Sequence, residues 1–376
     1  MSLYAPICVT YGNHYVCLGK VRVETLWPRT CTGVAMTQSA RLQSDPLRIS
    51  SLITAFYGSA AVLAAAELGV FEKLSHLRTG SAAMIAQTLR LDVRRATLLL
   101  DACVALGLLE KNYDLYRNSL DAETYLVPGR PLDLSGLIRS SRDVYPLCTG
   151  LAESVRTGAV KRVMAGPNGD PEQLTTELLS QHIRTLAIGR PIIRRLGLEG
   201  RKKLLEVSGG TGTYSVLISL EYPDLHCTVL DHPEVVKVAA GLIAQEGVSL
   251  NVSMLPGDFR TTPFPQGNDV VLMFGFLHRE PADQVPILIR RAAACLNPGG
   301  VLYVMDVMTD ESRTMPASSA LFALSLALTN REGHVFSHVD LQRWMEQAGL
   351  RDFSVEMLPP PVPHWLARGR KRVNGP

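Results

Sequence analysis

The sequence predicts a doubly wound α/β domain with a mostly parallel sheet, preceded by an all-α domain of winged-helix outline. Two observations carry this prediction. From Lys203 onward, short apolar runs alternate with helical stretches and are separated by Gly and Pro, which is typical of parallel strands covered by helices on both faces. Before that point the apolar residues follow helical spacing, as at Leu52, Phe56 and Leu63. The five expected strands read KLLEV, HCTVLD, LNVSML, DVVLMF and VLYVMD.

The length of 376 residues is typical of two or three domains. We expect an extension over 1–47, a winged-helix domain over 48–135, a helical linker and pocket-closing segment over 136–200, and the catalytic α/β domain over 201–370. The first 35 residues lack helical periodicity and hold three of the seven cysteines. We therefore interpret the extension as disordered or non-native.

The composition excludes several classes of function. A net charge of +3 is too small to indicate binding to nucleic acid or to an anionic membrane. Apolar runs such as 320–328 fall short of the roughly 20 residues of a membrane-spanning helix. The seven cysteines include no CxxC pair, so we expect neither a metal site nor a disulfide framework, and reduced thiols in a cytoplasmic protein are the simpler interpretation.

The winged-helix outline raises the question of DNA binding. Ser81 and Asp92 are expected N-caps, and Gly107 is an expected helix end before a hairpin. A recognition helix should present basic side chains along one face. Here Arg94–Arg95 are followed at once by leucines at 98–100, which favours a packing or dimerisation module.

The turn after the first strand, LLEVSGGTGTYS, is rich in glycine. Glycines let the backbone approach a ligand and adopt positive φ. Asp231 ends the next strand, 19 residues after Gly212, where an acid accepts hydrogen bonds from ribose hydroxyls. Dinucleotide and S-adenosylmethionine sites share these features. Ser215 replaces the third glycine of GxGxxG, which disfavours a nicotinamide dehydrogenase, and the Asp258–Phe259 pair suits an adenine ring.

Several motifs, in this order and spacing, resemble the S-adenosylmethionine-dependent O-methyltransferases of the acetylserotonin and plant-phenol type: EVSGGTG, TVLDHPEVV, PGDF, LH at 277–278, and LNPGG. AAELGVFEKL and LLLDACVALGLLEK resemble the winged-helix dimerisation domain of the same family. The likeness covers about residues 48–370. It implies a Rossmann-like methyltransferase sheet, S-adenosyl-L-methionine as cofactor, a small aromatic or polyketide-like acceptor, and a homodimer.

The resemblance also implies roles for individual residues. His278 matches the catalytic histidine, a general base, and Asp306 matches a carboxylate that orients it. The expected cofactor-binding residues are Glu206, Ser208, Gly209, Gly210, Gly212, Asp231, His232, Gly257, Asp258, Phe259 and Phe274. The expected acceptor-side residues are His182, Arg279, Phe322 and Leu326.

The chain departs from the family pattern at four places. Ser208 stands where glycine is usual, Phe274 replaces a frequent lysine, Arg279–Glu280 replace Asp-Trp, and Val335 occupies the position of a second orienting glutamate. A phenol and a histidine ordinarily differ by about 3.5 pKa units, or about 5 kcal/mol, so proton removal should accompany methyl transfer. Carbon methylation, use of the cofactor without methyl transfer, and a winged-helix regulator with a vestigial ligand domain remain alternatives.

Overall fold

The computed structural model describes residues 4–11, 14–22, 46–130, 132–160, 170–359 and 364–373. The chain divides into two units, Met1–Ile53 and Thr54–Pro376. The first contains an antiparallel hairpin of β1 (Tyr4–Tyr11) and β2 (His14–Arg22), and most of helix α1 (Pro46–Thr54). The predicted extension over 1–47 therefore includes a described hairpin, and its remaining residues up to 45 lie outside the described part.

The second unit begins with the winged-helix domain. The side chains of Ser81 and Asp92 accept hydrogen bonds from the N–H groups of Met84 and Arg95, so both predicted N-caps are confirmed. The predicted hairpin joins a short third strand in the sheet order β3-β5-β4. The elements are α2 (Phe56–Glu67), α3 (Val70–Leu77), β3 (Gly80–Ser81), α4 (Ala82–Leu89), α5 (Val93–Ala105), β4 (Leu109–Asn112) and β5 (Leu115–Asn118).

Helices connect this domain to the large sheet. They are α6 (Leu120–Tyr125), α7 (Ser135–Val144), η1 (Tyr145–Gly150), α8 (Leu151–Thr157) and α9 (Pro171–Ile193). Helix α9 begins favourably, because Asp170 caps the N–H of Glu172 and Pro171 occupies the first turn. It packs on α10 (Thr213–Glu221) and α11 (Pro233–Gln245) and shares an apolar cluster with them.

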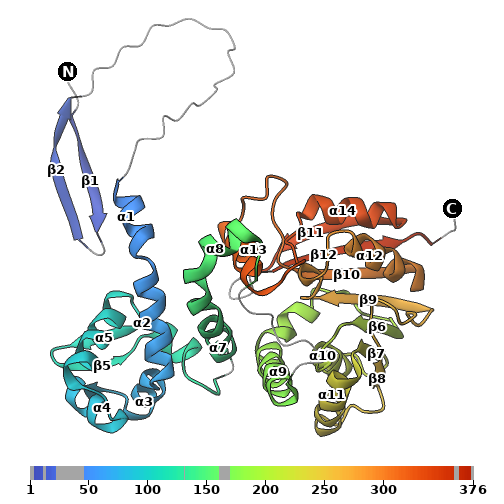
Figure 1. Cartoon of the computed structure of the whole chain (residues 1–376), viewed down its shortest axis with the longest axis horizontal. Helices are drawn as coiled ribbons and strands as arrows, with labels where there is room; N and C mark the ends of the chain where they lie inside the picture. Colours follow the sequence, from blue (N-terminus) through green and yellow to red (C-terminus); the bar gives the residue numbers. More distant parts are fainter. Residues whose placement is uncertain are drawn as a thin grey trace, which may run out of the picture. The chain divides into compact units, whose positions relative to one another are not determined.

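The large sheet has seven strands in the order β11-β12-β10-β9-β6-β7-β8 (Figure 1). The five predicted strands are present and parallel. Two further strands are added beyond β10: β12 pairs antiparallel with β10, and β11 pairs antiparallel with β12. The LNPGG motif lies within β10, which has a register shift between Leu296 and Val301. The strands are β6 (Lys203–Val207), β7 (His226–Asp231), β8 (Val252–Pro256), β9 (Asn268–Phe274), β10 (Leu296–Asp306), β11 (Leu350–Met357) and β12 (Trp365–Lys371).

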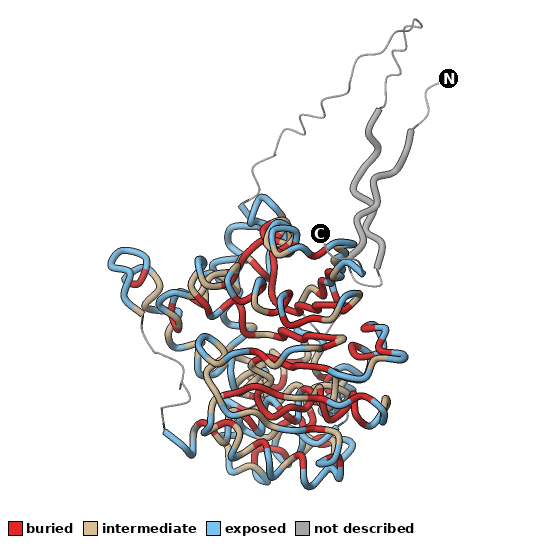
Figure 2. Tube along the Cα trace, turned by 90° about the vertical axis from the view of Figure 1, so that its right-hand side faces the viewer, coloured by how far each residue is buried: buried red, intermediate tan, exposed pale blue. Residues whose placement is uncertain are grey.

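The buried core follows the strands (Figure 2). Residues of α9, α10 and α11 pack in one apolar cluster, and residues of α12 (Gln284–Cys295) and α14 (His338–Gln347) pack in another with the opposite side chains of the strands. Strand β6 lies between β7 and β9, so the strand order reverses beside it. In such sheets ligands bind outside the carboxyl ends of the strands at this reversal.

Candidate active site

The turn between β6 and α10 has left-handed backbone at three residues. Gly210 has φ 59° and Gly212 has φ 67°, which glycine adopts readily. Ser208 has φ 54°, where a side chain costs roughly 1–2 kcal/mol. Its N–H donates to the carbonyl of Leu230 over 2.8 Å, which holds the strained residue in place. The serine noted as a departure in the sequence therefore occupies a position that needs positive φ.

The glycines also serve the packing of the turn itself. A Cβ on Gly209 would lie 2.6 Å from Val229 and 2.7 Å from Glu206, and a Cβ on Gly210 would lie 3.1 Å from Gln181 of α9. The sequence indicated that bare backbone makes room for a ligand. The structure adds that Gly209 packs too closely against β7 and Glu206 to carry a side chain.

Glu206 lies behind the turn and is 1% exposed. Its Oε2 accepts hydrogen bonds from the N–H and the hydroxyl of Ser215, over 3.2 and 2.5 Å. Burial raises the pKa of Glu206 to about 7, with a smaller contribution from the nearby Asp231. Ser215, at the position of the missing third glycine, thus anchors α10 to the end of β6.

The Asp231 carboxylate is tied to the turn by its backbone contacts. Oδ2 accepts the N–H of Gly210 and Oδ1 accepts the N–H of His232, each over 2.7 Å. Burial raises the pKa of Asp231 above its ordinary value, although these hydrogen bonds oppose the shift. Each oxygen keeps acceptor capacity for a hydroxyl. The buried Nδ1 of His232 has no partner among the described residues.

Gly257, Asp258 and Phe259 form a second turn, after β8. A Cβ on Gly257 would lie 2.3 Å from Oγ1 of Thr262, so this position needs glycine. The N–H of Gly257 donates to the carbonyl of Asp231 over 2.9 Å, which joins the ends of β7 and β8.

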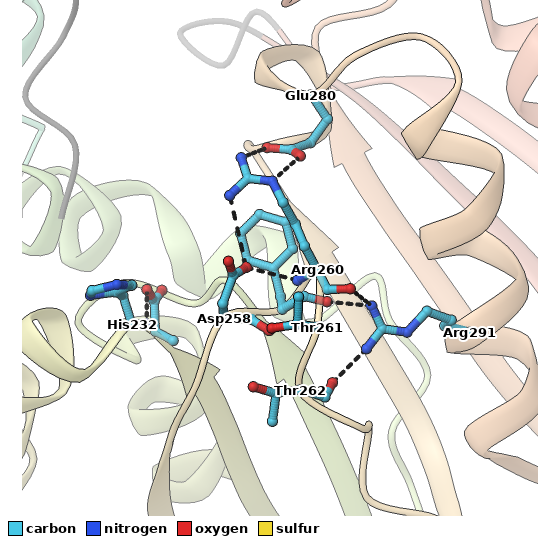
Figure 3. A network of polar contacts seen from close by, with 9 residues as sticks. His232, Asp258, Arg260, Thr261, Thr262, Glu280 and Arg291 are labelled. Atoms are coloured by element: carbon cyan, nitrogen blue, oxygen red, sulfur yellow. Dashed lines mark hydrogen bonds and ion pairs between the residues drawn. The ribbon is translucent and has the colours of Figure 1, made fainter. Parts of the chain in front are cut away.

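Arg291 of α12 holds this second turn by hydrogen bonds to its backbone. Its guanidinium donates to the carbonyls of Phe259, Arg260 and Thr262 (Figure 3). The Phe259 ring meets Phe276 edge-on, with centroids 4.9 Å apart. Arg291 and Phe276 together hold the turn in one conformation.

The residues of the two turns fit an adenosyl group. Asp231 offers acceptors for hydroxyls, Asp258 offers an acceptor for an amine, and Phe259 offers an aromatic ring. Residues 206–215, all within the described part, include no Lys or Arg, so the first turn lacks the side chains that bind phosphate. This donor set suits a nucleoside without phosphates. Phe274, another expected cofactor-binding residue, is buried and lies edge-on to Tyr214, with ring centroids 5.0 Å apart.

His278 and Asp306 meet at the same edge of the sheet. His278 belongs to the short helix η2 (Leu277–Arg279) after β9, and Asp306 ends the neighbouring β10. Their side chains lie 2.6 Å apart, Nδ1 to Oδ1, and are 6% and 0% exposed. Oδ2 also accepts the N–H of His278 over 3.2 Å. The carboxylate therefore fixes both the backbone and the ring of the histidine.

This contact determines what His278 can do. Burial opposes ionisation of Asp306, but its electrostatic interaction and hydrogen bond with His278 outweigh burial, so the pKa of Asp306 lies below its ordinary value. An ionised Asp306 can only accept, so Nδ1 carries the proton and Nε2 of a neutral ring keeps its lone pair. The arrangement suits a general base acting through Nε2.

One aromatic side chain among the expected acceptor-side residues contacts this base. The ring of Phe322, on α13 (Ala317–Thr329), lies edge-on to His278 with centroids 5.2 Å apart. Leu326 of the same helix and Val335 are buried. Val335 supplies no carboxylate, so Asp306 is the one described acidic partner of the His278 ring. Arg279 is exposed and has no acidic partner among the described residues.

His182 lies against the first turn. Its Nδ1 is 2.8 Å from Oγ1 of Thr213, which in turn is 2.6 Å from Oγ1 of Thr211. Burial lowers the pKa of His182. Its described hydrogen bond connects α9 to the start of α10, and its expected place on the acceptor side stays a prediction.

Two features of the site were absent from the sequence analysis. His364 precedes β12, where Trp365 pairs with Asp306 across the strands, and burial lowers the pKa of His364 to about 4. Arg260 forms a two-pronged ion pair with Glu280 (Figure 3). Neither has a local sequence signal, because both depend on segments distant in the chain. Among the described residues, no group of three or more His, Cys, Asp or Glu could hold a metal ion.

The fold and the donor set of the site suit a nucleoside-binding enzyme, and comparisons with known proteins identify its class as methyltransferase. Residues 168–351 match the model of an O-methyltransferase domain, and residues 50–128 match an O-methyltransferase dimerisation domain. The 8-O-methyltransferase TcmO of tetracenomycin polyketide synthesis, from Streptomyces glaucescens, is 31% identical over 87% of this chain and 97% of its own.

Two further likenesses extend over most of the chain. The 3-hydroxy-5-methyl-1-naphthoate 3-O-methyltransferase of Streptomyces sahachiroi is 28% identical, over 87% of this chain and 95% of its own. The human N-acetylserotonin methyltransferase, solved with S-adenosylmethionine, shares the fold with TM-score 0.74 and 24% identity, over 88% of this chain and 99% of its own. The chain belongs to the S-adenosylmethionine-dependent O-methyltransferase family.

Proposed function

We propose that this enzyme transfers a methyl group to a hydroxyl of a small aromatic, polyketide-like metabolite, with His278 as general base. The 2.6 Å contact between His278 and Asp306 carries the proposal, because it leaves Nε2 as the proton acceptor. The dyad and the adenosyl-binding turns all follow strands of one sheet at their carboxyl ends.

The bound cofactor supplies an activated methyl group. The protein has two tasks beyond binding: it holds the acceptor hydroxyl in line, and it removes one proton. Nε2 of His278 takes the hydroxyl proton while the new bond forms, and the ionised Asp306 stabilises the resulting imidazolium. The proton then passes from Nε2 to solvent after the product leaves.

We infer the acceptor class from the apolar side chains of α13 and from the names of the two bacterial relatives. The Phe322 ring lies beside the base, and Leu326 is a buried apolar residue of the same helix. An aromatic wall of this kind suits a flat ring system. The two bacterial relatives named above act on a naphthoate and in polyketide synthesis. Arg279, beside the base in sequence, is available to an acidic substituent of the acceptor.

The winged-helix domain serves dimerisation in this proposal. Its described surface exposes Phe56, Tyr57, Leu98 and Leu120, at 49%, 66%, 60% and 81%, and apolar exposure of this size is typical of a buried interface. The helical stretch Pro46–Glu67 is long and apolar enough to cross a membrane by length and composition. Since the matched dimerisation domain starts at residue 50, we assign its apolar surface to a homodimer in the cytoplasm.

A thermal shift followed by an acceptor screen tests the proposal. At about 100 times the dissociation constant, a ligand adds roughly 2.7 kcal/mol of stability. S-adenosylmethionine and S-adenosylhomocysteine should each raise the melting temperature, and NADPH should not. Hydroxylated naphthoates and related aromatic acids should then yield S-adenosylhomocysteine and a product heavier by one methylene, with His278→Ala inactive. Full activity of His278→Ala would refute the assigned base.

A further inference from the structure

The ion pair between Arg260 and Glu280 joins two parts of the site that the sequence gives no reason to connect. Arg260 belongs to the turn that follows β8, and Glu280 follows η2, two residues after His278. Nε and Nη2 of Arg260 donate to the two carboxylate oxygens of Glu280 over 2.8 and 2.7 Å (Figure 3). A planar two-pronged contact of this kind fixes distance and orientation together.

Burial makes this contact obligatory. The side chain of Glu280 is 3% exposed, and Arg260 is its described ion-pair partner. A buried carboxylate without a partner is strongly unfavourable, so Glu280 holds Arg260 whenever the site is formed. The carbonyl of Glu280 also accepts from His334, at 3.3 Å from Nδ1. The segment 278–280 is therefore fixed from two directions.

Arg260 also contacts the two residues assigned to the adenine. Its N–H donates to Oδ1 of Asp258 over 2.8 Å, and its Nη1 lies 3.8 Å from the same oxygen. Its guanidinium carbon lies 4.9 Å from the centroid of the Phe259 ring. An adenine bound to Asp258 and Phe259 must therefore act on the same side chain that holds Glu280.

We propose that Arg260 is a positioning residue that couples occupation of the adenine end to the placement of His278. An adenine that engages Asp258 and Phe259 changes the contacts of the guanidinium, which transmits the change through Glu280 to the segment carrying the base. This inference rests on the proposed function, and it explains why glutamate follows His278–Arg279 in this chain: the carboxylate is the anchor for Arg260.

Adenosine provides the test, because it fills the adenine end without a reactive sulfur beside His278. The full-length protein is labelled at its histidine rings, and the His278 NMR signal is assigned by its loss in His278→Gln. Calorimetry measures adenosine binding to each variant. Arg260→Met alone leaves a buried charge, so the decisive variant is Arg260→Met/Glu280→Met, which removes both charges. Arg290→Met, at an exposed arginine of α12, is the matched control.

In the wild type and in Arg290→Met, saturating adenosine should move the His278 signal. The double variant should still bind adenosine, but its His278 signal should stay in place. An equal shift in the double variant, or an unmoved signal in a wild type saturated with adenosine, would overturn the coupling. Failure of the wild type to bind either adenosine or S-adenosylhomocysteine would instead overturn the cofactor site, and the coupling with it.

Discussion

Replacing Glu206 by glutamine should make the protein more stable at neutral and alkaline pH. The glutamate is 1% exposed, and its Oε2 accepts two hydrogen bonds from Ser215. The glutamine side chain has the same size, and its carbonyl oxygen can accept both bonds. The substitution therefore removes the charge of the ionised form and leaves the packing of the turn in place.

The size of the effect follows from the pKa. Burial raises the pKa of Glu206 from 4.5 to about 7, and each unit is worth about 1.4 kcal/mol. Below pH 4.5 the group is neutral in both states and its contribution to stability is fully present. As the pH rises, the unfolded chain ionises first, and the folded state loses about 3 kcal/mol by the time the pH passes 7. Glutamine undergoes no such loss.

Urea denaturation of wild type and Glu206→Gln at several pH values between 4.5 and 8 measures this difference. The stability advantage of the variant should grow by about 3 kcal/mol over that interval. Glu332→Gln, at an exposed glutamate, is the matched control and should behave as the wild type. If the pH profiles of wild type and Glu206→Gln run parallel, burial does not raise the pKa of the Glu206 carboxyl.

Three further predictions concern the same site. Ser208→Gly should raise the free energy of unfolding by about 1 kcal/mol in denaturant titrations, because it relieves φ 54° at some cost in chain entropy; a loss of stability would contradict the strain. Gly209→Ala should cost about 1–3 kcal/mol and weaken calorimetric binding of S-adenosylhomocysteine, since its Cβ meets Val229 at 2.6 Å, whereas Gly241→Ala, with open space around it, should be tolerated. Asp306→Asn should lower kcat by roughly 10²-fold or more in methyl-transfer assays and leave S-adenosylhomocysteine affinity unchanged; an equal loss of affinity would indicate a structural role.

Elements with local signals could be predicted from the sequence. Apolar runs and their spacing located β6 to β10, and the residues Ser81 and Asp92 located two helix starts. The glycine turn, Asp231 and His278 were found because each lies at or shortly after the carboxyl end of a strand, and the carboxyl ends of parallel strands share one edge of a sheet.

Contacts between distant segments could not be predicted. The bond between His182 and Thr213 spans 31 residues, and the pair of Arg260 and Glu280 spans 20. A polar side chain on a helix or in a turn gives no indication of its partner, because packing of α9 on α10, and of the 257–262 turn on the 276–280 segment, decides it. The sequence showed Ser208 as a departure from the family pattern. Its positive φ, and therefore its strain, could be found only in the folded backbone.

A crystal structure of the protein with S-adenosylhomocysteine would test the central claim most directly. The account predicts the adenine against Asp258 and Phe259, the ribose hydroxyls on Asp231, and the sulfur turned toward Nε2 of His278. A nucleoside bound elsewhere, or a sulfur separated from His278 by protein, would contradict both the assigned cofactor site and the assigned base.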